Sequence, residues 1–152
     1  MNKTAKILLF CKKLPFGLWF FSRMVCLAAP FFSTISPCFI LLKSGHGEAI
    51  MKKRRAIKNH LGTIHAIAIA NLCELVAGTT LEITLPSAYR WIPKSMNIHY
   101  LSKATTDVLA RTLIEINSIP DTGSLQVVVD VLDQHEVAVV RAEIEMYISK
   151  KR

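Results

Sequence analysis

The dominant pattern in the chain is an apolar run over residues 63–77. The run holds no proline, is rich in alanine and leucine, and leaves almost no polar face. Such a composition predicts a helix, and a helix that is apolar all round is buried on all sides. Thr63 is placed to act as its N-cap after Gly62, and Gly78 is placed to end it as a C-terminal cap.

After this helix the pattern changes to alternation of apolar and polar residues, which is typical of half-buried strands. A strand is expected to begin within residues 79–85, and others to cover residues 96–103, 108–117, 125–132 and a last stretch ending near residue 148. The inward faces are predicted to carry Val108, Ala110, Thr112, Ile114, Ile116, Val127, Val129, Val131, Val140, Ala142, Ile144, Met146 and Ile148.

Before the helix, residues 37–43 form a short apolar run, Gly45 and Gly47 indicate a turn, and residues 48–58 are a candidate strand. One long buried helix combined with a meander of antiparallel strands predicts an α+β architecture. In that architecture the sheet wraps around the helix.

The N-terminal part is the most hydrophobic, yet Pro15, Arg23, Pro30 and Pro37 interrupt it. A membrane-spanning helix needs about 20 mainly apolar residues without a break, so no membrane span is expected. We expect two short amphipathic helices that meet at residues 14–17, the second ending before Pro30. Peripheral membrane contact through the aromatic cluster remains an alternative.

These patterns divide the chain into an N-terminal helical arm, residues 1–36, and a main domain, residues 37–152. The total of 152 residues is enough for one core, and 51% hydrophobic with 20% charged residues excludes a disordered chain.

The four cysteines, Cys11, Cys26, Cys38 and Cys73, form no CxxC pair and have no histidine at zinc-ligand spacing. This predicts free thiols in a reducing compartment, hence a cytoplasmic protein, with no metal site. No cofactor is expected.

The net charge of +8 suits an anionic partner such as a nucleic acid, a membrane surface or a phosphate-bearing small molecule. The basic tetrad at residues 52–55 is either a nucleic-acid patch or part of an edge strand whose lysines discourage further pairing. We favour the edge strand, so no nucleic acid is expected as a partner.

Three polar residues mark the apolar helix: His65, Asn71 and Glu74. A carboxylate in such surroundings is costly unless it is paired, hydrogen-bonded or neutralised. Asn71 and Glu74 are three residues apart and share a face, whereas His65 and Glu74 are nine apart and point to opposite faces. Two copies of the helix, side by side in a homodimer, could bring a histidine and a glutamate to one substrate.

A purely structural interpretation of the same residues is open. Gly62 serves only the turn in that case, His65 is a core histidine, and Glu74 pairs with an arginine such as Arg90. In the functional interpretation, free backbone N–H groups at Gly62 and Thr63 hold an oxyanion or a phosphate.

Residues 59–65, Asn-His-Leu-Gly-Thr-Ile-His, followed by Glu74, resemble the active-site segment of hotdog-fold acyl-CoA thioesterases of the phenylacetate-pathway type. That family has the pattern Asn-x-x-Gly-Thr-x-His-Gly-Gly and then a helical Asp or Glu. The longer run 59–78, with residues 89–94, 100–101, 14–17 and 29–32, is similar to the DUF4442 group of hotdog proteins.

The resemblance implies a hotdog fold, with an antiparallel sheet around a long central helix, and hydrolysis of an acyl-CoA thioester at a dimer-interface site. The amide of Ala66 would polarise the thioester carbonyl, and Glu74 of the partner subunit would act as general base or nucleophile. Asn59 and His65 would position the thioester, and Asn71 would orient Glu74 or the water. Arg90, Lys94 and Lys103 would contact the CoA phosphates; the alternative for these basic residues is a solvated surface, which we favour for Lys103.

The chain departs from the thioesterase pattern after the histidine, where Ala66 and Ile67 replace Gly-Gly. The added side chains narrow the approach of an acyl thioester. The second hypothesis is therefore a non-catalytic acyl or CoA binder on the same fold. A third, a nucleic-acid binder, rests on the net charge and the basic residues 52–55. The expected assembly is a homodimer or a dimer of dimers.

Overall fold

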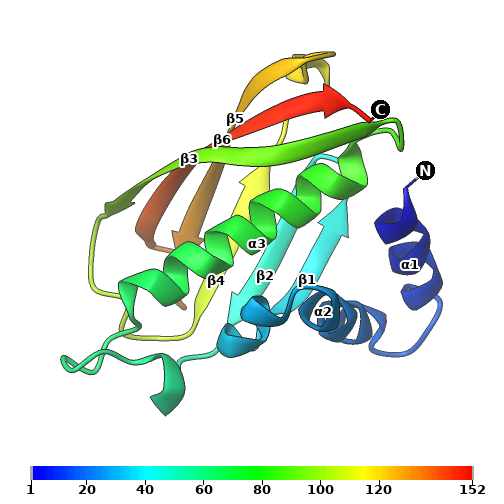
Figure 1. Ribbon diagram of the computed structural model, residues 1–152. Helices are drawn as coiled ribbons and strands as arrows, with labels where there is room; N and C mark the ends of the chain where they lie inside the picture. The colour runs from blue at the N-terminus through cyan, green and yellow to red at the C-terminus, as the bar shows by residue number, and fades with distance from the viewer. Residues whose placement is uncertain (1, 152) are drawn as a thin grey trace.

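The computed structural model describes residues 2–151 as one six-stranded antiparallel sheet curled around a single long helix, with an arm of short helices beside them (Figure 1). The strand order is β1-β2-β4-β5-β6-β3. The elements are α1 (Lys3–Cys11), α2 (Gly17–Ala28), the 3-10 helix η1 (Pro30–Ile35), β1 (Cys38–Lys43), β2 (His46–Met51), the 3-10 helix η2 (Arg55–Ile57), α3 (Ala66–Thr84), β3 (Tyr89–Tyr100), β4 (Val108–Leu113), the 3-10 helix η3 (Ile116–Ser118), β5 (Gly123–Leu132) and β6 (Ala138–Lys150). The α+β hotdog architecture expected from the sequence is confirmed.

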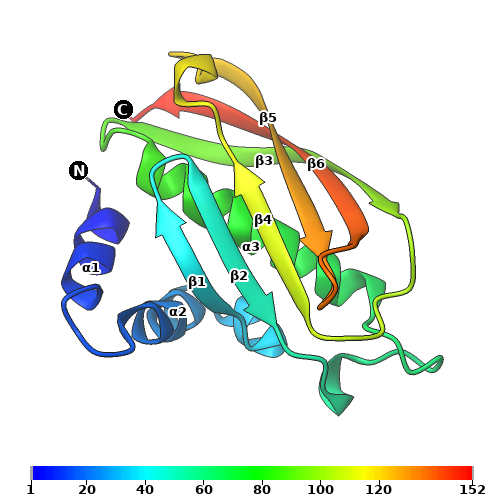
Figure 2. The same ribbon diagram turned by 180° about the vertical axis from the view of Figure 1, so that it is seen from behind.

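The core lies between α3 and the concave face of the sheet, whose outer face is turned to the viewer in Figure 2. Leu72, Val76 and Leu81 of α3 are fully buried there. The alternation in β4, β5 and β6 is confirmed, because all the predicted inward residues are buried except Ile116. Ile116 is exposed because β4 ends at Leu113 and the chain enters η3.

The central helix is longer than predicted and begins later. It runs from Ala66 to Thr84, so residues 79–84 continue the helix instead of starting a strand. The prediction failed because Leu81 and Leu85 fit both periods: they alternate as in a strand, yet they are also four apart, and both are buried. The next strand is β3, which begins at Tyr89 rather than at residue 96.

Gly78 lies inside α3 and is not its C-terminal cap. The indole of Trp91 from β3 packs against the backbone there, and a Cβ on Gly78 would lie 2.5 Å from its Cη2 atom. Gly47 is likewise inside β2 rather than in a turn, and Thr80 of α3 packs against its backbone. Both glycines allow the helix to approach the sheet closely.

The basic residues 52–55 do not belong to an edge strand, because β2 ends at Met51 and pairs with β1 and β4 on its two sides. Instead they fasten the chain that leaves the sheet. The Nζ of Lys53 donates to the carbonyl of Thr105 at 2.8 Å, and Arg54 Nη2 donates to the hydroxyl of Ser36 at 3.2 Å. The edges of the sheet are β1 and β3.

The N-terminal arm consists of the two predicted helices, α1 and α2, and then η1. Its inner residues Leu8, Cys11 and Phe21 belong to the same core as α3 and the sheet. The prediction of free thiols is confirmed for all four cysteines. One helix, α3, has the length and apolar composition of a membrane span, but it is the core helix and over half of it is buried inside the protein.

We predict that Gly78→Ala lowers the free energy of unfolding by about 1–2 kcal/mol, because the new methyl group overpacks against Trp91. Helix propensity alone would give a gain of about 1 kcal/mol. Urea unfolding of wild type and variant measures the change.

The matched control repeats the substitution in a Trp91→Leu background, where the ring is absent. There Gly78→Ala should be neutral or stabilising. An equal gain in both backgrounds would contradict the packing of the indole against Gly78.

Candidate functional site

The loop before α3 is held by the side chain of Asn59. Its Oδ1 accepts from the amides of Leu61 and Thr63 at 3.0 and 3.1 Å, and its Nδ2 donates to the Thr63 hydroxyl at 2.8 Å. Gly62 lies at the exposed tip with φ of +77°, a conformation that suits glycine. Asn59 therefore shapes this loop through three local bonds.

His65, and not Thr63, is the N-cap of α3. Its Nδ1 accepts from the amide of Ile67 at 3.1 Å, so the neutral ring carries its proton on Nε2. The prediction of Thr63 failed because Asn59 engages both the amide and the hydroxyl of that residue. His65 precedes the helix, so the angle of a helical wheel does not describe its direction relative to Glu74.

Ala66 is the first residue of α3, and its backbone amide is a free donor. Within residues 2–151 no acceptor takes this N–H, whereas the neighbouring amides of His65 and Ile67 are both engaged. The carbonyl of Ala66 accepts from the Tyr100 hydroxyl at 3.2 Å. A free N–H at the positive end of a helix is suited to stabilise a developing oxyanion.

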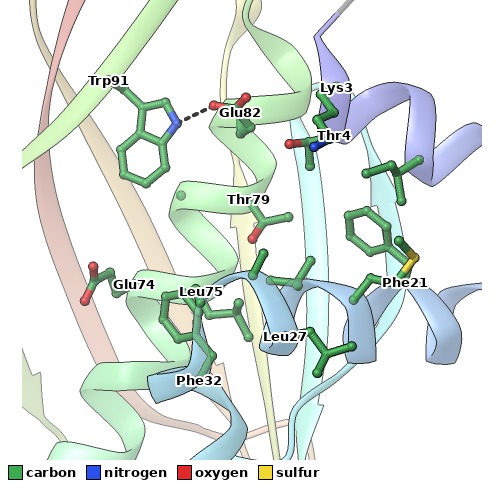
Figure 3. A pocket seen from close by; sticks show the side chains of 16 residues that line it. Lys3, Thr4, Phe21, Leu27, Phe32, Glu74, Leu75, Thr79, Glu82 and Trp91 are labelled. Atoms are coloured by element: carbon green, nitrogen blue, oxygen red, sulfur yellow. Dashed lines mark hydrogen bonds between the residues drawn. The ribbon is translucent and has the colours of Figure 1, made fainter.

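Glu74 lies on the outer side of α3, half-buried, where it lines a cavity of about 580 Å³ between α3, the arm and Trp91 (Figure 3). Its carboxylate has no hydrogen bond and no ion pair to any of the residues that the structure describes. The proposed structural pairing with Arg90 does not form, because the Arg90 Nε donates to the hydroxyl of Ser149 at 3.2 Å.

Ala66 and Glu74 are eight residues apart on the same helix, which separates them by about 12 Å along its axis. One subunit therefore does not bring the free amide and the carboxylate to one substrate atom. The outer side of the first half of α3 is also not covered: Ile67 is 60% exposed and Ala66, Ala68 and Ala70 are half-buried. The expectation of a helix buried on all sides is wrong for the single chain, because the sheet reaches only the inner side.

Asn71 and Glu74 line different cavities. Asn71 faces a smaller one of about 200 Å³ with His65, and its Nδ2 reaches the Thr34 hydroxyl of η1 at 3.3 Å. Its buried Oδ1 has no partner among the described residues. The N-terminal arm, predicted from the sequence as a segment apart from the main domain, separates these two cavities.

The three basic residues considered for the CoA phosphates are not together. Lys94 lies over the ring of Tyr147, 5.1 Å from its centre, and Tyr147 alternates with buried neighbours, so both face away from α3. Arg90 is on the same outer face through Ser149. Lys103 lies next to Ala104, whose carbonyl accepts from the Ile64 amide at 2.9 Å, and is therefore close to the start of α3.

Two titratable residues near the helix keep their protons at neutral pH. Burial, with a further contribution from Asp130, raises the pKa of the Cys73 thiol to about 12, so it is not a thiolate nucleophile. Burial and then Cys73 raise the pKa of Tyr100, which keeps its hydroxyl as a donor to Ala66. The sequence pattern predicted a strand around Tyr100 but not its contact with the start of α3.

Among residues 2–151, no group of three or more His, Cys, Asp and Glu side chains is placed to hold a metal ion.

A family model described as "Domain of unknown function (DUF4442)" matches residues 17–148. A crystal structure of a genomics target is 37% identical, with a TM-score of 0.87 over 99% of this chain and 100% of that chain. No curated protein matches the sequence.

More distant structures show the same fold. A Pseudomonas aeruginosa protein, described as a probable thioesterase of unknown function, is 18% identical with a TM-score of 0.80, covering 91% of this chain and 97% of its own. The smu.793 protein of Streptococcus mutans, solved with acetyl-CoA bound, is 20% identical with a TM-score of 0.64, covering 75% of this chain and 89% of its own.

We predict that Asn59→Ala loosens the loop without unfolding the protein. Loss of three side-chain bonds should raise hydrogen exchange of the amides of Leu61 and Thr63 at least tenfold and lower the free energy of unfolding by about 1–2 kcal/mol. Asn97→Ala, in the exposed part of β3, is the control and should leave these amides unchanged. Unchanged protection in Asn59→Ala would refute its role in the loop.

Proposed function

The chain belongs to the DUF4442 family, and from this membership we propose that it hydrolyses acyl-CoA thioesters at a site shared between two subunits. The observation that carries the proposal is a pair of groups on α3 that have no partner within residues 2–151: the amide of Ala66 at its start and the carboxylate of Glu74 on its outer side. An unpaired, half-buried carboxylate is enriched at functional sites. The thioesterase description of one structural neighbour and the acetyl-CoA in another support the reaction class.

In the proposed reaction the thioester carbonyl oxygen accepts from the Ala66 amide, which stabilises the negative charge that develops there. Glu74 of the partner subunit takes a proton from water as the water oxygen attacks the carbonyl carbon. The carbon–sulfur bond then breaks, the acid product forms, and the departing CoA thiolate takes the proton from Glu74, which restores the carboxylate. Direct attack by the Glu74 carboxylate, followed by hydrolysis of the anhydride, is the other route.

A second copy is proposed to dock along β3 and the uncovered side of α3. β3 is a 12-residue edge strand, and unpaired strand edges favour pairing with another chain. The other edge, β1, is in contact with α2. Ile92 of β3 and Ile67 of α3 are 53% and 60% exposed. A two-fold axis between copies would bring Glu74 of one subunit to the Ala66 amide of the other without requiring the two to meet within one chain.

The remaining residues take positioning roles in this proposal. Asn59 and Gly62 shape the loop beside the thioester, and His65 fixes the first turn of α3. The free Oδ1 of Asn71 offers an acceptor near His65. Among the basic residues the geometry supports Lys103 for the CoA phosphates, whereas Arg90 and Lys94 lie on the outer face.

A second candidate function is binding of acyl-CoA without turnover. It is favoured by Ala66 and Ile67, which stand where glycines would leave more room for the thioester. Affinity for acyl-CoA without hydrolysis at any chain length would establish it.

We predict that Glu74→Ala and Glu74→Gln lower kcat for acyl-CoA hydrolysis at least a hundredfold and leave the fold and assembly unchanged, because each removes the proton acceptor. Release of free thiol measures the rate. Glu115→Gln is the matched control: it makes the same change at an exposed glutamate that lines neither cavity beside α3. An unchanged rate in the Glu74 variants would reject the catalytic role.

Ala66→Pro tests the oxyanion donor. Proline is tolerated as the first residue of a helix, and the extended backbone of His65 is compatible with a following proline. The substitution removes only the free N–H, so kcat should fall about a hundredfold to a thousandfold while α3 stays folded. Ala66→Gly keeps the N–H and should stay active.

Mixing the two inactive variants tests whether the site is shared. If Glu74 acts on the amide of the other subunit, mixed dimers of Glu74→Ala and Ala66→Pro contain one intact site, and activity returns to about a quarter of wild type at random exchange. If each site lies within one subunit, mixing restores nothing.

A further inference from the structure

A large cavity lies on the outer side of α3, under the N-terminal arm (Figure 3). Its volume of about 580 Å³ is within the range of small-molecule sites. The walls are mainly aliphatic and aromatic: Ile7 from α1, Phe21, Val25 and Leu27 from α2, Phe32 from η1 and Leu75 from α3. We call it the arm groove.

The arm groove is fixed by polar contacts that hold the arm in place. Buried Asn2 accepts from the Ala5 amide at 2.8 Å and donates to the Glu82 carbonyl of α3. The Ser22 hydroxyl accepts from the amide of Phe39 in β1 at 2.8 Å, and Lys12 Nζ donates to the Leu42 carbonyl at 2.7 Å. Hydrogen bonds thus hold the arm at both ends of α1 and at the middle of α2, so the walls of the groove are fixed in position.

One wall of the arm groove is formed by Trp91. Its Nε1 donates to Glu82 Oε2 at 3.0 Å, and its ring lies against Gly78, where no side chain interferes. This contact occupies one carboxylate oxygen of Glu82. Glu74 borders the same groove and has no hydrogen bond or ion pair within residues 2–151, so the groove adjoins the residue assigned to the reaction.

We infer that the arm groove binds the hydrocarbon chain of the acyl group, so the substrate is a medium- or long-chain acyl thioester. The inference rests on the proposed function, because it takes Glu74 as the reaction centre. An acetyl group or a strongly polar acyl group leaves these apolar walls in water, whereas an alkyl chain covers them.

The groove also indicates a chain length. Glu74 and Glu82, which both line it, are eight residues apart on α3, or about 12 Å along the axis. With C–C bonds of about 1.5 Å in a zigzag, that span accommodates roughly eight to ten carbons.

The test measures binding separately from turnover. Isothermal titration of Glu74→Gln with CoA, acetyl-CoA, octanoyl-CoA and dodecanoyl-CoA, all below their micellar concentrations, should show affinity rising about fourfold for each added methylene until the groove is filled. Equal affinity for acetyl-CoA and octanoyl-CoA would overturn the inference.

A filled groove provides the matched comparison. Ala28 is exposed on α2 and lines the groove, so Ala28→Trp should fill it and abolish the preference for octanoyl-CoA over acetyl-CoA. Ala88→Trp, an equal change at an exposed loop position outside the groove, should keep the preference. Thr79→Phe fills the groove from α3 and serves if Ala28→Trp does not fold. Retained preference in the filled variants would also overturn the inference.

Hydrolysis by wild type over the same series separates this inference from the proposed function. If binding depends on chain length but no thioester is cleaved, the arm groove stands and the thioesterase proposal fails. If hydrolysis occurs while binding ignores chain length, the thioesterase proposal stands and the arm groove is rejected.

Discussion

The 19-residue helix α3 carries apolar residues on all of its sides and is stabilised by their burial, yet a single curled sheet can enclose only one side of it. The inner side of α3 meets the alternating apolar residues of the strands, where Leu72 and Val76 are fully buried. The outer side of α3 is not covered by the sheet. The arm takes the second half of the helix, and the first half stays open in the single chain. Both the candidate site and the arm groove follow from this incomplete enclosure.

The candidate functional groups on α3 lie where the sheet and the arm no longer cover the helix. The free amide of Ala66 lies at the helix start, fixed by the N-cap His65 on one side and by Tyr100 on the other. Glu74 lies where the arm and the exposed stretch meet, and its carboxylate has no hydrogen bond or ion pair to the part of the chain that the structure describes. A half-buried carboxylate without such a partner in the single chain suits a site that a substrate and a second subunit complete.

The arm does more than cover apolar surface. Its helices are held by buried side-chain bonds from Asn2 and Ser22, and the space that they leave against α3 is mainly apolar and is bordered by Glu74. Close packing of the arm onto α3 would have enclosed the helix more completely. The glycine at position 78 has a related effect, because it brings Trp91 close and sets one wall of the groove.

The sequence alone determined the α+β architecture, the two arm helices and the inward residues of β4 to β6, because these depend on local periodicity. A short motif also marked Asn59, His65 and Glu74 as candidate site residues. Only the tertiary structure decided that α3 continues through Gly78 to Thr84. Leu81 and Leu85 fit the period of a helix and that of a strand, and the packing of α3 against Trp91 and Gly47 favours the helix. The tertiary structure also decided that Asn71 and Glu74 line separate cavities and that Arg90 faces away from both. Such facts depend on which distant segments pack together, and residue spacing within one element carries no information about that.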